Sequence, residues 1–282
     1  MPSYVLSLSC DDKPGLVASV ANSIFSLEGN ITEAQQFNDS ETGRFFMRVM
    51  FTSSKDEDAI NAAIGPIAQT YNMSTRLSDQ ARRKRVLLLV SKFDHCLADL
   101  LYRHRTGELE MDIVGIVSNH PRESISTQNI GPIMFYHLPV TKESKAQQEG
   151  QIKALVLSSG AELIVLARYM QILSDDLAGW LTGRCINIHH SFLPGFKGAK
   201  PYHQAHTRGV KMIGATAHYV TADLDEGPII HQDVEAISHA DAPDDLVRKG
   251  RDIERRVLAA AVRLHLQDRV LLNGTRTIVF RD

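Results

Sequence analysis

The chain has 282 residues, enough for one large domain or for a small and a medium domain that each bury a core. Its 31 basic and 33 acidic residues are interspersed and give a net charge of -2, which provides no basic surface for nucleic acid. The apolar runs are far too short to span a bilayer, no secretory signal is evident, and three widely spaced cysteines fit neither a disulfide framework nor a zinc knuckle. We therefore expect a cytoplasmic protein without nucleic-acid or membrane partners, without a metal and without a resident cofactor.

The first 80 residues have the pattern of a small domain of their own. The predicted elements are a strand at 4–10, a helix from about 14, strands at 31–38 and 44–52, a helix at 55–71 and a strand at 74–77. The apolar face of the first helix is expected to consist of Leu16, Val17, Val20, Ala21, Ile24 and Phe25. The order βαββαβ is the ferredoxin-like arrangement, so we predict an α+β domain at residues 1–80.

Two short motifs of this domain resemble those of ACT domains, namely residues 12–16 (DKPGL) and 29–31 (GNI). The resemblance implies a regulatory domain that binds a free amino acid between paired copies, and glycine and methionine are our candidates for this ligand. The N–H groups that open the first helix suit the carboxylate of such a ligand. The residues expected to bind the effector are Asp12, Pro14, Gly15, Leu16 and Asn30. The chain would then be a homo-oligomer, a dimer or tetramer; alternatively, the domain only pairs subunits.

Beyond a charged linker at 80–84, short apolar strands alternate with amphipathic helices. Strands are predicted at 85–91, 111–117, 133–138, 163–167, 185–188 and 215–221, helices at 95–103, 142–159, 174–181 and 244–267, and a hairpin at 270–280. This alternation predicts a doubly wound, mostly parallel α/β sheet for residues 85–282. Ligands of such sheets bind beyond the carboxyl ends of the strands, which is where the polar residues after position 186 fall.

Three residues of the second domain carry a recognisable chemistry. Asn187 and His189 stand two positions apart at a strand end, so their side chains share one face of the sheet. Asp225 follows on a loop that Gly227 and Pro228 bound. An amide, an imidazole and a carboxylate can hold an oxyanion, move a proton and orient a nucleophile, as attack on a carbonyl requires. The trio predicts an acyl-group enzyme, although each residue taken alone is more often a turn or capping residue than a catalytic one.

The segments 187–189, 191–194 and 224–228 resemble the signature of the folate-dependent formyltransferase family. The resemblance extends from about residue 85 to the end and implies 10-formyl-tetrahydrofolate as the substrate. It assigns Asn187 and His189 to the oxyanion and Asp225 to the nucleophilic water.

The same resemblance extends to supporting and folate-binding residues. His218 and His190 are expected to support the trio, although His218 could be a packed strand histidine and His190 stands where most transferases carry proline. Main-chain groups and apolar side chains of two loops are expected to hold the folate. These residues are Arg168, Met170, Ile172, Leu173, Val220, Thr221 and Leu224; for Met170 and Ile172 the alternative is ordinary core.

The loop at 91–97 bears on which acceptor takes the formyl group. It has no glycine and contains Asp94, so it does not predict a phosphate site, and no basic C-terminal domain follows that would hold tRNA. An ACT-like domain ahead of a formyltransferase-like domain is the layout of the deformylases of this family, in which water is the acceptor. We therefore expect hydrolysis to tetrahydrofolate and formate. The alternatives are transfer to a small unphosphorylated amine, a metal hydrolase using histidines such as His203 and His206, a nicotinamide enzyme, and an inactive amino-acid sensor.

Overall fold

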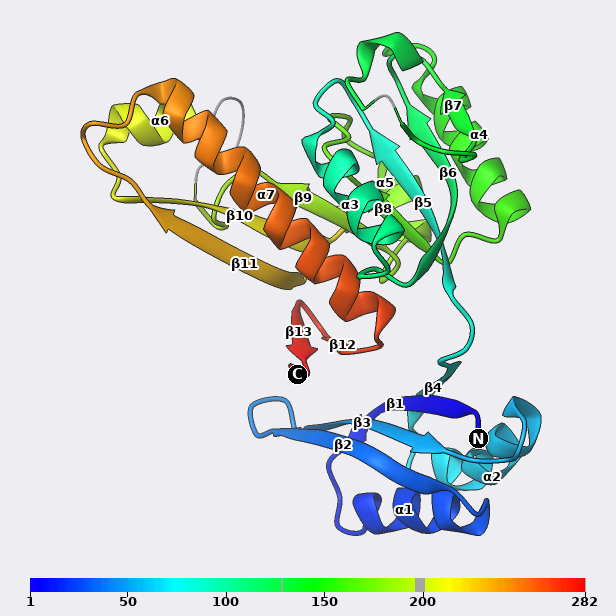
Figure 1. Cartoon of the computed structure of the whole chain (residues 1–282). Helices are drawn as coiled ribbons and strands as arrows, with labels where there is room; N and C mark the ends of the chain where they lie inside the picture. Colours follow the sequence, from blue (N-terminus) through cyan, green and yellow to red (C-terminus); the bar gives the residue numbers. More distant parts are fainter. Residues whose placement is uncertain (128, 196–200, 282) are drawn as a thin grey trace. The chain divides into compact units, whose positions relative to one another are not determined.

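The computed structural model describes residues 1–127, 129–195 and 201–281, which divide into two compact units (Figure 1). The N-terminal unit comprises Met1–Arg83 together with Gln267–Asn273 and the residues from Ile278 onward. The C-terminal unit comprises Lys84–Leu266 and Gly274–Thr277. Much of the chain beyond residue 266, which the sequence pattern assigns to the second domain, is therefore packed with the first unit.

The N-terminal unit has the predicted βαββαβ order. Its elements are β1 (Ser3–Asp11), α1 (Leu16–Ser26), β2 (Asn30–Asp39), β3 (Arg44–Thr52), α2 (Glu57–Thr70) and β4 (Ser74–Asp79). The strands pair antiparallel in the order β2-β3-β1-β4, the ferredoxin-like arrangement. Alternate residues of β1 such as Leu6 and Leu8 pack with Val20 of α1 and Ile60 of α2, so both helices cover one face of the sheet.

The predicted apolar face of α1 is too wide. Leu16, Val20 and Ile24 are buried at a spacing of four residues, but Val17 is 41% and Phe25 79% exposed. Each of these two residues follows a buried one and is turned about 100° away from it around the helix axis, so both side chains lie beside the core rather than in it.

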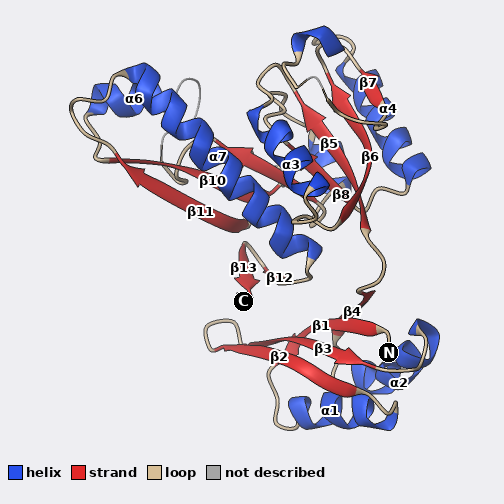
Figure 2. Ribbon diagram, in the orientation of Figure 1, coloured by secondary structure: helices blue, strands red, loops and turns tan. Residues whose placement is uncertain are grey.

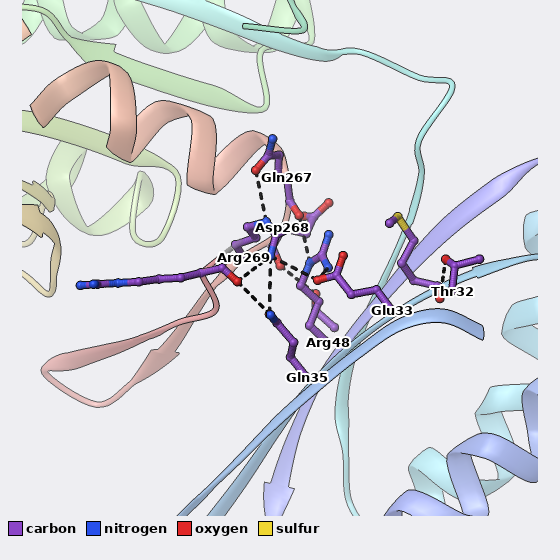
Figure 3. A network of polar contacts seen from close by, with 10 residues as sticks. Thr32, Glu33, Gln35, Arg48, Gln267, Asp268 and Arg269 are labelled. Atoms are coloured by element: carbon purple, nitrogen blue, oxygen red, sulfur yellow. Dashed lines mark hydrogen bonds and ion pairs between the residues drawn. The ribbon is translucent and has the colours of Figure 1, made fainter. Parts of the chain in front are cut away.

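The helix-free face of the N-terminal sheet carries part of the chain's own C-terminal segment (Figure 3). Arg48 of β3 donates a hydrogen bond to the backbone oxygen of Gln267 (3.2 Å) and another to Glu33 of β2 (2.9 Å). Arg269 donates to the same Glu33 carboxylate (3.2 Å), and Ser7 donates to the backbone oxygen of Asp268 (3.3 Å). Polar groups on this face are thus paired with residues more than 200 positions away in the sequence.

The C-terminal unit is built from alternating strands and helices. Its elements are β5 (Lys84–Val90), α3 (His95–Arg105), β6 (Met111–Ser118), η1 (Arg122–Ser124), β7 (Phe135–His137), α4 (Lys145–Ser159), β8 (Leu163–Leu166), α5 (Asp175–Trp180), β9 (Cys185–His189), α6 (Pro201–Arg208), β10 (Met212–Tyr219), β11 (Ile229–Ala236) and α7 (Pro243–Leu266). The predicted C-terminal hairpin is β12 (Val270–Asn273) with β13 (Arg276–Val279).

The sheet of this unit has the order β11-β10-β9-β8-β5-β6-β7 and is mostly parallel, as predicted. Strands β7, β6, β5, β8 and β9 are parallel to one another, whereas β10 pairs antiparallel with β9 and β11 pairs antiparallel with β10. Strand β10 starts at Met212 and ends at Tyr219, so Val220 and Thr221 lie in the following loop and not in the predicted strand. Strand β11, at the sheet edge, was not predicted because its central residues, His231, Gln232 and Asp233, are polar.

Helices cover both faces of this sheet, as Figure 2 shows. Ile152 and Val156 of α4 and Leu177 of α5 pack on one face, against Leu87 and Leu89 of β5. Helix α7 contacts α3 and lies along β9, β10 and β11. Within the described part of the chain, no helix has the length and hydropathy needed to cross a membrane.

Candidate active site

A cavity of about 570 Å³ lies beyond the carboxyl ends of β8 and β9. Its lining includes the loop after β8 (168–173), the end of β9 (187–190), the loop after β10 (220–225) and the first half of α7, together with Phe93 and His95 after β5 and Tyr202 and His203 of α6. This is the position that the doubly wound topology predicts for a ligand. The predicted catalytic, supporting and folate-binding residues all line this one cavity.

The predicted trio and His218 meet in one cluster. Asp225 Oδ2 lies 3.2 Å from His189 Nδ1, and Asp225 Oδ1 lies 3.7 Å from His218 Nε2. Asn187 Nδ2 is 3.3 Å from the same nitrogen of His218. Asn187 and His218 are direct partners across the β9–β10 pair, which explains why their side chains share one face. His218 is therefore a member of the cluster and not only a packed strand histidine.

Asp225 owes its place to a tight loop between β10 and β11. Its φ of 59° is in the left-handed region, which residues other than glycine seldom adopt. Two residues further on, a Cβ atom added to Gly227 would lie 1.7 Å from the backbone oxygen of Tyr219, so only glycine fits there. The N–H of Tyr219 donates to the oxygen of Pro228 (2.9 Å), which closes the loop at its base. These constraints point the carboxylate at the two imidazoles.

The charges of the cluster follow from its surroundings. Burial raises the pKa of Asp225, but hydrogen bonds and charge from His189 and His218 outweigh burial and hold this pKa well below its ordinary value. Burial, together with the nearby charge of Arg168, lowers the pKa of His190 to about 4. Asp225 is therefore ionised and His190 neutral near neutral pH. Among the described residues, the buried Nε2 of His189 has no hydrogen-bond partner and remains free for a ligand.

The predicted folate loops bring exposed apolar side chains to the same cavity. Met170 is 49%, Ile172 61% and Leu224 56% exposed, so ordinary core is the wrong reading for Met170 and Ile172. Large apolar side chains left in water around a cavity indicate a binding surface. Leu173, Val220 and Thr221 are half-buried in the same lining.

A second cluster in the cavity, centred on Glu254 of α7, was missed by sequence reasoning. Glu254 is 1% exposed; it contacts His95 Nε2 at 2.8 Å and accepts a hydrogen bond from the Tyr202 hydroxyl at 2.7 Å. Its Oε2 also lies 3.3 Å from Arg168 Nε. Burial raises the pKa of Glu254, but the His95 hydrogen bond and the Arg168 charge outweigh burial and lower it, so the carboxylate is ionised.

One signal in the sequence could have revealed Glu254. It lies four residues after Gly250 and three before Val257 on the buried face of α7, where a charged side chain requires a partner. At Gly250, an added Cβ would lie 2.1 Å from Tyr202 Cζ, so the absence of a side chain admits the tyrosine ring.

The side chains of this cluster argue against the metal-hydrolase alternative. Among the described residues, the group whose donor atoms are close enough to hold a metal is His95, Cys96 and Glu254, and not the histidines near His203 and His206. Burial, with the charge of Glu254, raises the pKa of the Cys96 thiol well above its ordinary value, so this ligand stays protonated. The guanidinium of Arg168 beside Glu254 would also repel a cation. The donor set does not suit a metal ion.

Comparison with known proteins defines the class. Residues 84–262, within the C-terminal unit, match the formyl transferase family. A formyltetrahydrofolate deformylase from Corynebacterium sp. is 47% identical over 99% of this chain and 98% of its own length. The crystal structure of formyltetrahydrofolate deformylase from Burkholderia mallei is 50% identical and covers all of both chains with a TM-score of 0.94. The crystal structure of glycinamide ribonucleotide transformylase 1 from Symbiobacterium toebii is 27% identical, with a TM-score of 0.65, and covers 73% of this chain and 98% of its own.

The chain belongs to the formyl transferase family, and to its formyltetrahydrofolate deformylases in particular. This confirms the family resemblance of residues 187–194 and 224–228 and the α/β fold that it implied.

Proposed function

We propose that this chain hydrolyses 10-formyl-tetrahydrofolate to tetrahydrofolate and formate. The observation that carries the proposal is the meeting of Asn187, His189, His218 and Asp225 at one cavity of a deformylase-family fold. In the overall reaction water forms a bond to the formyl carbon, the carbon–N10 bond breaks, and N10 receives a proton. Formate and one further proton are released.

Asp225 is the proposed base. Its depressed pKa keeps it ionised, and its carboxylate can hold a water molecule and accept a proton as that water attacks the formyl carbon. His189 contacts Asp225 through Nδ1, so its Nε2 donates a hydrogen bond only when the ring carries both protons. An imidazolium beside the carboxylate satisfies this condition. Nε2 of His189 and the amide of Asn187 would then stabilise the oxyanion of the tetrahedral intermediate.

The two supporting histidines have separate proposed roles. His218 contacts both Asp225 and the amide of Asn187, so it fixes the orientation of these two side chains. The ring of His190 lies 5.2 Å from that of His189, and burial keeps it neutral. It suits the transfer of a proton toward the leaving nitrogen better than the stabilisation of negative charge.

The folate is proposed to enter between the loops after β8 and β10. Met170, Ile172, Leu173 and Leu224 offer apolar surface for the pterin ring. The N–H of Val220 is bonded to the oxygen of Cys185, so the Val220 carbonyl and the peptide group of Thr221 are the groups proposed to meet the donors and acceptors of the ring. The side chain of Arg168 lines the same cavity near Glu254.

Water rather than an amine is the proposed acceptor because Asp94 ties the loop after β5 to the segment that follows η1. The Asp94 carboxylate accepts hydrogen bonds from the N–H (2.6 Å) and hydroxyl (2.7 Å) of Thr127. A loop tied by an acidic side chain is a poor cradle for a phosphorylated amine.

The test is to incubate the purified protein with 10-formyl-tetrahydrofolate alone. We expect equal amounts of formate and tetrahydrofolate, and the same rate after exhaustive chelation. A requirement for an added amine would favour the transferase alternative, and loss of activity on chelation would favour a metal hydrolase.

The N-terminal unit is proposed to be an ACT-like regulatory domain for glycine or methionine. Asp12, Pro14 and Gly15 are exposed at the start of α1, whereas Asn30 is exposed at the start of β2, at the opposite end of the sheet. The side chain of Leu16 is buried, so only its backbone can contribute. The double substitution of Asp12 and Asn30 by alanine should abolish the response of turnover to these amino acids. An unchanged response would place the effector elsewhere.

Pairing of two such domains is proposed through the edge strand β2. The helix-free face already carries residues 267–269, whereas β2 is largely exposed and presents Ile31 (37%) and Phe37 (44%) to solvent. Substitution of Phe37 by lysine should shift a dimer or tetramer toward the monomer in sedimentation experiments.

The buried free thiols of Cys10, Cys96 and Cys185 suit the reducing cytoplasm.

A further inference from the structure

We propose that Arg168 forms a carboxylate-binding subsite in the cavity, next to the proposed site of hydrolysis. The inference rests on the proposed function because the reaction supplies one carboxylate, formate, and the glutamate of the folate carries two more.

Arg168 is buried without being satisfied. The residue is 9% exposed, and among the described residues its Nε and Nη1 atoms have no hydrogen-bond partner. Nε approaches Glu254 Oε2 to 3.3 Å, an ion-pair contact whose geometry is not that of a hydrogen bond. Leaving donors of a charged group buried and unpaired is costly, so such donors are expected to face a ligand.

The backbone at Arg168 is also unusual. Its φ of 63° is in the left-handed region. Any residue other than glycine adopts this region only at a cost in conformational free energy. Ser91 secures this conformation, because its N–H donates to the oxygen of Arg168 (3.2 Å) and its hydroxyl accepts from the N–H of Met170 (3.0 Å). The strained position is thus held by neighbouring contacts, as is common where a side chain must be aimed at a ligand.

Charges around Arg168 favour an anion. The Phe93 ring is flanked by Arg168 at 6.0 Å and by Arg251 at 5.8 Å, and both arginines line the cavity. Glu254 is the acidic residue in contact with Arg168, and it is already engaged by His95 and Tyr202. The guanidinium of Arg168 is therefore only partly neutralised.

A carboxylate fits this site in shape as well as in charge. The guanidinium is planar and can donate parallel hydrogen bonds to both oxygens of one carboxylate. Formate is the smallest such ligand and is formed in the same cavity. The pKa of His190 responds to the charges of both Arg168 and Asp225, and the ring is neutral. His190 therefore adds no second positive charge that would compete with Arg168 for the carboxylate.

The test compares wild type with Arg168→Gly. Glycine adopts a φ of 63° without strain, so this variant should fold while losing the guanidinium. Formation of tetrahydrofolate is followed while sodium formate is added. We expect the inhibition constant of formate to rise at least about tenfold, as the loss of charge-assisted hydrogen bonds implies. Lys92→Gln removes the same charge from an exposed residue outside the lining and should leave formate inhibition unchanged.

A second substrate distinguishes the two sources of carboxylate. If Arg168 binds the glutamate, Arg168→Gly raises KM about tenfold for 10-formyl-tetrahydrofolate but not for the analogue that lacks glutamate, and formate inhibition stays unchanged. Unchanged formate inhibition together with unchanged KM for both substrates overturns the subsite. Arg168→Lys, which keeps the charge but not the fork, should lose part of the effect; it serves in place of the glycine variant should that variant not fold.

Broadening of the ¹³C-formate resonance by the protein, without any folate, separates this inference from the proposed reaction. Formate that is broadened by wild type and not by Arg168→Gly supports the subsite even in a protein that does not turn over. Equal broadening by the two proteins together with an unchanged KM for 10-formyl-tetrahydrofolate, in a preparation that does turn over, overturns the subsite and leaves the hydrolysis standing.

Discussion

Two buried arginines, one in each unit, have opposite surroundings. Arg48 in the N-terminal unit is 2% exposed and donates to Glu33 and to the backbone of Gln267. Arg168 in the C-terminal unit is 9% exposed, lies on a strained backbone and has unpaired donors among the described residues. The same residue type at similar burial thus holds a fold together in one place and remains available to a ligand in the other. What distinguishes them is the pairing of their donors, not burial.

The largest effect is predicted for Asp225, whose carboxylate contacts His189 and His218 in the cavity. Asp225→Asn should reduce kcat by about 10²- to 10⁴-fold, because an amide cannot accept the proton of the attacking water. Thermal unfolding should show a folded protein. Asp223→Asn, an exposed substitution in the same loop, is the matched control and should turn over like wild type. Turnover of Asp225→Asn near the wild-type rate would remove the proposed mechanism.

Asn187 should have the next largest effect. Asn187→Ala removes one proposed oxyanion donor and should reduce kcat by about 10²- to 10³-fold with a smaller change in KM. An increase in KM alone would mean that Asn187 binds the ground state of the substrate and not the transition state.

Arg48 should show the reverse signature. Arg48→Met breaks a buried ion pair and a hydrogen bond to Gln267, which should lower the free energy of unfolding by about 2–4 kcal/mol. Glu33 keeps Arg269 as a partner, so the loss should be smaller than for a fully orphaned carboxylate. The turnover of the folded fraction should stay at the wild-type value. Chemical denaturation together with active-site titration measures both quantities, and a fall in turnover without a fall in stability would contradict the comparison.

The sequence predicted the parts of the molecule that depend on local pattern. Apolar periodicity placed nearly every strand and helix, and the spacing of Asn187 and His189 located the site at the end of β9. Strand β11 was missed because an edge strand with polar residues lacks an apolar run. Glu254 and the face that carries residues 267–269 were missed for another reason: their partners lie up to about 260 residues away, and no local pattern records such pairing.

The smallest predicted effect concerns pH and depends on the partly buried ring of His190. The pKa of His190 is about 4 in the folded chain and 6.5 in an exposed histidine, so between these values the unfolded chain binds more protons. The free energy of unfolding should therefore fall as pH is lowered through this window, by on the order of 3 kcal/mol at its acid end. His190→Gln should flatten this part of the stability curve, whereas His239→Gln, at an exposed position, should not. The low pKa of Asp225 changes stability in the same direction but in a lower window, because its contribution to stability is lost only as pH falls below about 4. Equal slopes for wild type and His190→Gln between about pH 4 and 6.5 would show that His190 is protonated as easily as an exposed histidine.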